Sequence, residues 1–182
     1  MDQSEIVQSV NAIKSSHLKE LSKQQIVDCT NNAIYMNFGC SGGHVSNSLQ
    51  YVIDSGLVEE NVYPYKNNRK QCKLIVGWPT TGISEYAEIG YLDVNKMMDS
   101  IIKYGPLIAY VAASSIYFQL YASGVLDDSS CITYGIDHVV LIVGFGWDNV
   151  SNKDYWLIKN SWGTDWGEVL KFYLLKNTTF LF

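Results

Sequence analysis

Residues 134–167 read Y-G-I-D-H-V-V-L-I-V-G-F-G-W-D-N-V-S-N-K-D-Y-W-L-I-K-N-S-W-G-T-D-W-G, and this stretch decides the fold. Two apolar runs, Val139–Val143 and Tyr155–Ile158, flank the polar loop Asp148–Asp154. Runs of β-branched and aromatic residues bounded by Gly and Asn/Asp clusters are typical of strands. The stretch therefore predicts an antiparallel hairpin inside a β-rich part of the chain.

The hairpin places His138 at the entry to its first strand and Asn160 at the exit of its second strand. Antiparallel pairing brings these two positions side by side, and an amide carbonyl beside an imidazole fixes the ring's tautomer and orientation. Trp162 lies two residues further on, where its indole can shield that hydrogen bond from water. The pair has two interpretations: a structural His with a strand-end Asn, or part of a catalytic site.

Two motifs in this stretch resemble those of a known family. The segments D-H-x-V-x-x-V-G-F-G and Y-W-x-I-K-N-S-W-G-x-x-W-G are similar to the His and Asn regions of papain-like cysteine peptidases, the papain and cathepsin family. The resemblance implies that His138 is the general base and imidazolium partner of a thiolate. It also implies that Asn160 orients the His and that Trp162 shields the pair.

The rest of the chain divides by hydrophobic period into a helical half and a strand-rich half. The helices are expected over 3–16, 22–28, 47–53 and 94–104, and further strands over 107–113 and 169–175. This is an α+β arrangement. The resemblance implies one papain-like peptidase domain over 1–182, with a helical lobe (1–84), an antiparallel β-rich lobe (85–182) and the cleft between them.

Two local patterns refine these helices. Ser22 followed by Gln25 predicts a capping box that opens the second helix. Met97 and Met98 are expected to pack into the core rather than serve a cofactor. We expect no metal and no cofactor.

The turn Gly39-Cys40-Ser41-Gly42-Gly43 is rich in glycine, as expected in any fold for a tight turn with positive φ angles. In the family the resembling loop carries substrate along its backbone, and the Gly43 position pairs with the peptide as an added strand. By resemblance, the residues that contact a peptide or protein substrate are Gly42, Gly43, His44, Val45, Ile136, Asp137 and Trp162. Most of the pocket residues are apolar, which favours an apolar substrate side chain, although His44 departs from the family pattern.

The chain contains four cysteines. The resemblance implies a disulfide between Cys29 and Cys72 and leaves Cys40 and Cys131 without their family partners. The alternative interpretation is four free thiols in a protein of a reducing compartment. The family's nucleophile lies in a Q-x-x-x-C-G-S-C-W segment, and no such segment occurs here. The resemblance thus predicts a chain that is incomplete at its N-terminus, where the nucleophile segment would lie, and shortened at its C-terminus.

Composition excludes several other classes. The formal net charge of −5 argues against a nucleic-acid-binding protein, which needs a basic face. No apolar run is long enough to span a membrane, and the first 15 residues lack the apolar core of a secretory signal. The resemblance implies a monomer in a lysosomal, vacuolar or extracellular location, with protein inhibitors as further partners.

Two functions remain open at this point. The first is a cysteine peptidase domain that retains His138 and Asn160 while its nucleophile is absent from these residues. The second is a catalytically inactive homologue that keeps its cleft for binding. Under both interpretations the 182-residue chain is expected to show no peptidase turnover.

Overall fold

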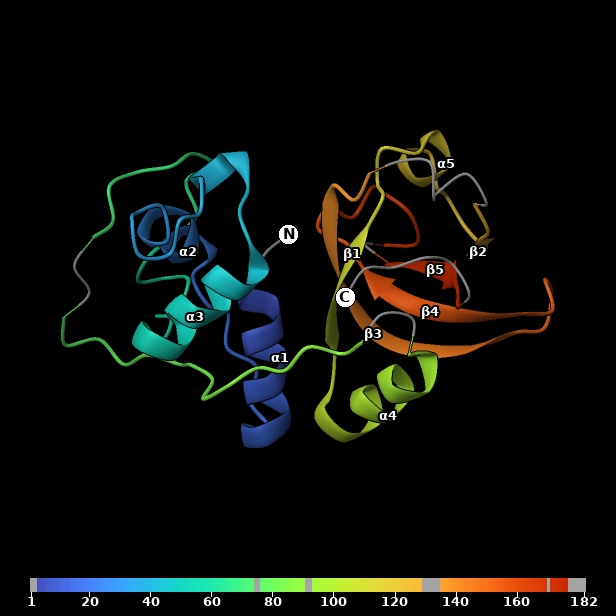
Figure 1. The fold of residues 1–182 in the computed structure, drawn as a ribbon, viewed down its shortest axis with the longest axis horizontal. Coiled ribbons are helices and arrows are strands. Elements are labelled where there is room, and N and C mark those ends of the chain that lie inside the picture. Colours follow the sequence, from blue (N-terminus) through green and yellow to red (C-terminus); the bar gives the residue numbers. More distant parts are fainter. Residues whose placement is uncertain (1–2, 74–75, 91–92, 129–134, 170, 177–182) are drawn as a thin grey trace. The chain divides into compact units, whose positions relative to one another are not determined.

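The computed structural model describes residues 3–73, 76–90, 93–128, 135–169 and 171–176. The chain forms two compact units that divide between Ala87 and Glu88 (Figure 1). We call the unit that precedes the division the helical unit and the unit that follows it the sheet unit. Each is described by itself.

The helical unit contains three α-helices and one 3₁₀ turn. These are α1 (Ser4–Ser15), α2 (Lys23–Cys29), η1 (Gly39–Ser41) and α3 (Val45–Ser55). Its buried apolar core consists of Val7, Leu21, Ile26, Cys29, Tyr51, Val52 and Leu57. The sequence predicted all three α-helices.

Helix α3 shows how sequence spacing produces this core. Val45, Leu49 and Val52 recur on one face and are all buried. The helix ends at Gly56, whose φ of +66° is readily accessible only to glycine. A Cβ there would lie 2.8 Å from Thr80 side-chain atoms, so glycine is required for the close approach as well. The helix is two residues longer at each end than the predicted 47–53.

The other two helices depart from expectation in detail. In α1, Val7 is fully buried, but Ile13 is 63% exposed, so the predicted apolar face is only partly used. At the start of α2, the Ser22 hydroxyl accepts a hydrogen bond from the Gln25 N–H at 3.0 Å. The reciprocal half of the predicted capping box is wrong, because the Ser22 N–H donates to Val58 O and Gln25 Oε1 accepts from the Val58 N–H, both at 2.9 Å.

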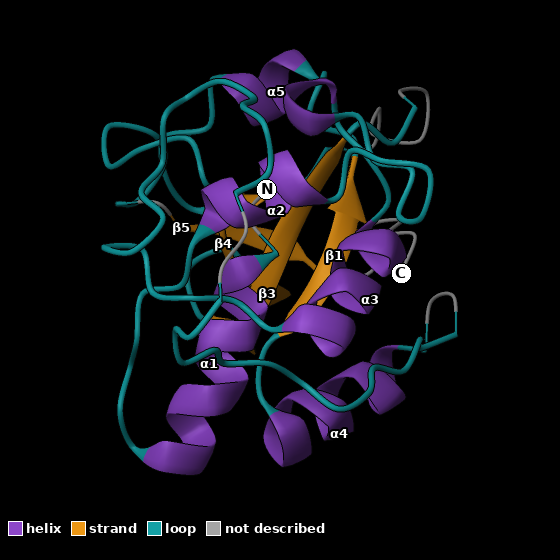
Figure 2. Cartoon of the chain, turned by 90° about the vertical axis from the view of Figure 1, so that its left-hand side faces the viewer, coloured by secondary structure: helices purple, strands orange, loops and turns teal. Residues whose placement is uncertain are grey.

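Within the described residues, the sheet unit contains two helices and five strands. They are α4 (Val94–Tyr104), β1 (Leu107–Val111), α5 (Ile116–Gln119), β2 (Val125–Leu126), β3 (His138–Asp148), β4 (Lys153–Lys159) and β5 (Lys171–Leu175). Figure 2 distinguishes helices from strands by colour. The strand order is β1-β3-β4-β5-β2. All neighbours are antiparallel except β2 and β5, which are parallel. The predicted α+β class is confirmed.

The predicted hairpin is the pair β3–β4. Its register places Leu141 opposite Lys159, and a bulge interrupts it between Ile142 and Gly144. Both strands extend into the polar loop, because Asp148 still pairs with Lys153. The turn is therefore shorter than predicted.

The core of the sheet unit is formed by buried residues from the strands, from α4 and α5, and from the segments that flank α5: Met97, Ala109, Val111, Ala113, Phe118, Tyr121, Val140, Ile142, Trp156, Ile158, Phe172 and Leu174. Met97 is 1% exposed and Met98 packs against this core, so the prediction that both methionines pack is confirmed. Helix α4 begins at its N-cap Asp93, whose side chain accepts from the Lys96 N–H at 3.0 Å.

Two strands are shorter than predicted. Strand β1 ends at Val111 instead of continuing to residue 113, and β5 begins at Lys171 instead of residue 169. Strand β2 was not predicted. No helix in the described ranges is long and apolar enough to cross a membrane.

Candidate functional site

The hydrogen bond predicted between His138 and Asn160 is present. The distance between His138 Nε2 and Asn160 Oδ1 is 2.8 Å. His138 begins β3, and Asn160 follows the last residue of β4. Because the two strands are antiparallel neighbours, the end of one lies beside the start of the other.

The surroundings of Asn160 decide which ring nitrogen of His138 carries hydrogen. Asn160 Oδ1 also accepts from the Ser161 N–H at 2.8 Å, which identifies this atom as the carbonyl oxygen of the amide. An amide oxygen only accepts, so His138 Nε2–H must be the donor. In the neutral ring, Nδ1 then has a free lone pair and can take up a proton.

Asn160 is fixed by burial. Its residue is 1% exposed. Within the part of the chain that the structure describes, its Nδ2 has no hydrogen-bond partner. An unpaired buried donor lowers the stability of the fold. Stability alone therefore does not account for an asparagine at position 160.

Aromatic rings surround the His138 side chain. The Trp162 ring lies 5.2 Å from it, centroid to centroid, and the Phe118 ring 6.3 Å away. Phe118 also contacts Trp162 and Trp166, at 5.2 and 5.3 Å. These apolar faces restrict the access of water to the imidazole.

The electrostatic effects on His138 oppose one another. Burial lowers the pKa of His138 below its ordinary value of 6.5, because the charged ring loses solvation. The hydrogen bond to Asn160 raises this pKa, but less than burial lowers it. The neutral, proton-accepting ring is therefore favoured over a wider pH range than in an exposed histidine.

Asp137 connects the start of β3 to the end of β1. Its Oδ1 accepts from the Ala113 N–H at 2.7 Å, and its Oδ2 accepts from the Ser114 hydroxyl. Its own N–H donates to Val111 O at 3.2 Å. These bonds hold the residue that precedes His138, and they explain why β1 pairing stops at Val111.

Sequence reasoning missed part of this arrangement. It gave Ala113 and Ser114 no role, and no local pattern marks them as partners of Asp137. It also did not place Phe118 beside His138. Phe118 lies in α5, a helix of only four residues, which is too short to show a helical period in the sequence.

Four of the predicted substrate-contact residues lie in the helical unit. Gly42 has a φ of +105°, and a Cβ on Gly43 would lie 2.4 Å from Asn37 Oδ1. That same oxygen accepts from the His44 N–H at 2.8 Å, so Asn37 holds the turn against the start of α3. His44 is exposed, whereas Val45 is 6% exposed and faces the interior.

The other predicted contacts, Ile136, Asp137 and Trp162, lie in the sheet unit near His138. Ile136 is 39% exposed and Trp162 is 40% exposed. Both leave a substantial apolar surface open. Their contact with a substrate remains a prediction.

The disulfide prediction is confirmed for its bonded pair. Cys29 and Cys72 form a disulfide with Cα atoms 4.7 Å apart. Cys40 is an exposed free thiol. The prediction for Cys131 lies outside the described residues. A search of the described ranges finds no cluster of three His, Cys, Asp or Glu side chains that could hold a metal ion.

Comparisons with known proteins agree with this fold. A family model described as papain family cysteine protease matches residues 3–179. Mouse (Mus musculus) cathepsin S is 38% identical over 157 residues, covering 86% of this chain and 45% of the relative. Cathepsin L1 of Drosophila melanogaster is 39% identical over 167 residues, covering 90% of this chain and 44% of the relative. The chain thus spans about half the length of these curated relatives.

Solved structures show the same similarity. The bromelain protease from Ananas comosus, in complex with the E64 inhibitor, matches with a TM-score of 0.85 at 30% identity, covering 97% of this chain and 78% of that chain. A cysteine protease from Carica candamarcensis, in complex with E-64, matches with a TM-score of 0.82 at 30% identity, covering 96% and 76%.

Proposed function

The chain belongs to the papain family of cysteine proteases, and from that membership we propose that His138 and Asn160 are the proton-transfer part of a peptidase active site. The 2.8 Å hydrogen bond from His138 Nε2 to Asn160 Oδ1 carries this proposal. It fixes the tautomer in which Nδ1 accepts a proton. The position of both residues in segments that resemble family motifs supports a catalytic role over a purely structural His–Asn contact.

The proposed reaction is acyl transfer from a peptide. Nδ1 of His138 takes the proton from a cysteine thiol, and the thiolate attacks the carbonyl carbon of the scissile bond. The imidazolium then gives that proton to the leaving amine, which leaves an acyl-enzyme. Water deprotonated by His138 attacks the thioester, and the proton returns to the thiolate as the acid product departs.

We assign the nucleophile to a segment outside residues 1–182. The family's C-G-S-C-W motif is absent from these residues. Cys29 and Cys72 are engaged in a disulfide and so have no thiol. The chain as printed is therefore expected to have an intact base but no peptidase turnover.

The proposed substrate is a peptide or protein. Gly42 and Gly43 would offer backbone groups to an extended peptide. At Gly43 the place of a Cβ is already taken by the Asn37 side chain, so glycine is needed to keep this backbone conformation. His44, Val45, Ile136, Asp137 and Trp162 complete the proposed contact set. The inhibitor E-64, which is bound in the two solved relatives, and protein inhibitors are proposed as further ligands.

The proposal extends to the organisation of the protein and its location. We assign a helical lobe to 1–84 and a β-rich lobe to 85–182, supported by the division of the compact units at Ala87. The Cys29–Cys72 disulfide favours a lysosomal, vacuolar or extracellular location, because disulfides persist in oxidising compartments. We propose a monomer.

The test compares two proteins: residues 1–182, and the same chain extended before residue 1 by a family segment that contains Q-x-x-x-C-G-S-C-W. The extended chain should hydrolyse a fluorogenic peptide, and E-64 should block it. The 182-residue chain should not. A correctly folded extended chain without activity would favour the inactive homologue, and E-64-sensitive turnover by residues 1–182 would overturn the assignment of the nucleophile.

Variants of the extended chain test the base. His138→Ala should lower kcat by about six orders of magnitude, the loss seen when the base of a comparable triad is removed. His17→Ala is the matched control, because His17 is exposed and belongs to α1's C-terminal flank. Full activity in His138→Ala would show that this residue is structural.

A further inference from the structure

Residues 66–73, which we call the basic loop, concentrate positive charge on an acidic chain. The loop reads K-N-N-R-K-Q-C-K and contains four of the 13 Lys and Arg residues. No Asp or Glu occurs between Glu60 and Glu85. The chain as a whole has a formal net charge of −5, so this local excess is opposite in sign to the rest of the molecule.

The main chain of the basic loop is anchored to helix α2. The side chain of Gln24, which is fully buried, accepts from the Lys66 N–H and donates to Asn68 O, both at 2.8 Å. The buried carboxylate of Asp28 accepts from the Lys70 N–H at 2.6 Å. The disulfide from Cys72 to α2 fixes the far end. These bonds order the backbone while the charged side chains remain exposed.

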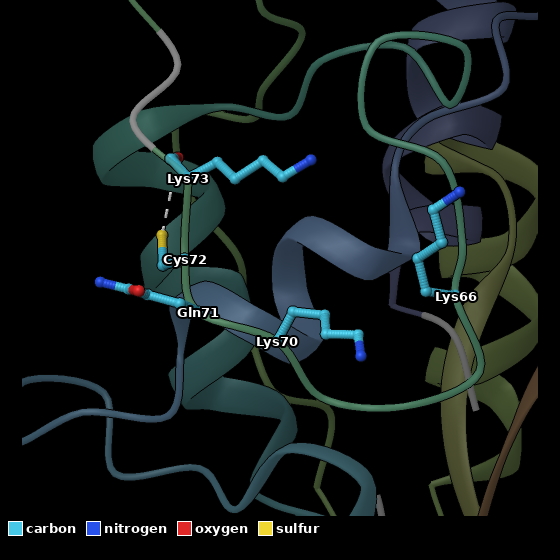
Figure 3. A pocket seen from close by; sticks show the side chains of 5 residues that line it. All are labelled: Lys66, Lys70, Gln71, Cys72 and Lys73. Carbon is cyan, nitrogen blue, oxygen red and sulfur yellow. Dashed lines mark hydrogen bonds between the residues drawn. The ribbon is translucent and has the colours of Figure 1, made fainter.

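The anchored loop surrounds a surface pocket. Figure 3 shows the side chains that line it: Lys66, Lys70, Gln71, Cys72 and Lys73. In that view the side chains of Lys70 and Lys73 extend from one stretch of the loop toward the stretch that carries Lys66. The pocket therefore combines three ammonium groups and one side-chain amide, all of which donate hydrogen bonds.

Among the residues that the structure describes, no carboxylate forms an ion pair with these cations, and Lys73 Nζ lies 5.4 Å from the centroid of the Tyr63 ring. Within the described ranges, ion pairs are formed by Lys19, Lys153 and Lys176, and by none of the cations of the basic loop. Asp28 is the nearest acid in the anchoring network, and it is already engaged. Its Oδ1 accepts from Lys70 N–H and Gln24 Nε2, and its Oδ2 accepts from the Tyr63 hydroxyl at 2.9 Å.

We propose that the basic loop is a binding site for a multiply charged oxyanion, a ligand with several sulfate or phosphate ester groups. Ammonium groups form strong, charge-assisted hydrogen bonds to such oxygens. A backbone fixed in advance spares the ligand the cost of ordering the loop. Two sources offer this chemistry: a sulfated polysaccharide and a small polyphosphate. The site lies wholly in the helical unit and does not depend on the proposed peptidase activity.

The experiment titrates the 182-residue chain with two probes, dextran sulfate and inorganic tripolyphosphate, by calorimetry at low ionic strength. Binding of at least one probe is expected, and it should weaken as salt rises toward about 0.15 M, because exposed charges are screened. Binding of dextran sulfate alone identifies a polymeric sulfate ligand. Binding of tripolyphosphate identifies a compact ligand. Failure of both probes at low salt overturns the proposal.

A matched pair of triple variants locates the site. K66Q/K70Q/K73Q removes the three pocket lysines, whereas K14Q/K96Q/K103Q removes three exposed lysines elsewhere with the same change in net charge. Each exposed ion pair is worth a factor of about two to five in affinity, so the pocket variant should bind about tenfold more weakly or worse. The control variant should bind within about twofold of the unchanged chain. Equal losses in the two variants would show attraction to net charge rather than a site.

A second readout separates loss of the site from loss of the fold. The three pocket lysines are exposed, and the bonds that anchor the loop come from backbone groups, so K66Q/K70Q/K73Q should retain the Cys29–Cys72 disulfide. Thiol counting on the denatured variant checks this directly. In the unchanged chain, the Lys66 and Lys70 amide resonances should shift on addition of the bound probe. Shifts confined to other residues would overturn the placement.

Discussion

At the scale of single residues, the state of His138 results from two opposed influences on one ring. Burial among Trp162 and Phe118 removes solvent from the imidazole and disfavours its charged form. The Asn160 carbonyl stabilises the Nε2–H and, with it, the imidazolium. A base with this balance stays neutral over a wider pH range than an exposed histidine, and it holds a proton less firmly once it has taken one up.

The balance predicts the direction of a pKa change. In the 182-residue chain, the pKa of His138 should lie below 6.5. Asn160→Ala removes the bond that favours the charged ring, so the pKa of His138 should fall further. Imidazole resonances followed by NMR across pH measure both values, with exposed His17 as the internal control. A pKa that rises in Asn160→Ala would show that the amide does not stabilise the imidazolium.

The residues of the candidate site differ in how far the sequence reveals them. The His138–Asn160 contact follows from an antiparallel hairpin whose strands are marked by apolar runs, and each residue lies in a segment that resembles a family motif. The Asp137 contacts with Ala113 and Ser114 do not follow, because they join segments 23 and 24 residues apart through one side chain. A sequence pattern reports which face a residue occupies, whereas the partner of one carboxylate depends on tertiary packing.

At the scale of elements, the chain is most predictable where an apolar pattern is long. Helix α4 has the predicted bounds, Val94–Tyr104, because it is marked by Asp93 before it and Gly105-Pro106 after it. Strand β2 has only two residues, Val125 and Leu126, too few to display a period. Its parallel partner lies in β5, so no turn residue signals the pairing.

The disulfide that joins α2 to the basic loop should contribute substantially to stability. It closes a loop with a sequence separation of 43 residues. The chain-entropy model gives about 4 kcal/mol for a loop of that size. Replacing Cys29 and Cys72 together by Ser should therefore lower the free energy of unfolding by about 2–4 kcal/mol in urea denaturation.

The exposed Cys40 offers the control for this variant. Cys40→Ser should change the free energy of unfolding by less than about 0.5 kcal/mol. Thiol counting on the unchanged, denatured chain should find two free thiols, at Cys40 and Cys131. An unchanged stability in the double variant would mean that hydrogen bonds from Gln24 and Asp28 hold the loop alone.

At the scale of the whole molecule, the chain has two separate apolar cores, one in each unit. Val52 is fully buried in the helical core, and Ile158 is fully buried in the sheet core. Each should therefore support its own unit. The cores explain how a chain of ordinary composition stabilises two different architectures.

Shortening one buried side chain in each core tests whether the two cores are independent. Val52→Ala should cost about 2 kcal/mol and Ile158→Ala about 2–5 kcal/mol, from lost burial and the cavity left behind. Hydrogen exchange should accelerate first in the helical unit for Val52→Ala and first in the sheet unit for Ile158→Ala. Val150→Ala, at a position that is 95% exposed, is the control and should be neutral. Equal acceleration throughout the chain in both variants would show one cooperative core.

The parallel pairing of β2 with β5 also sets an order of events during synthesis. Residues 125–126 leave the ribosome long before residues 173–174, with which they pair. The β3–β4 hairpin can close early, since its strands are contiguous, but the sheet is complete only after the last strand has been made. A nascent chain paused before residue 171 would expose the unpaired edge of β4, which is a template for pairing with another chain. Strand β5 therefore covers an edge of β4 that would otherwise make the growing molecule prone to aggregation.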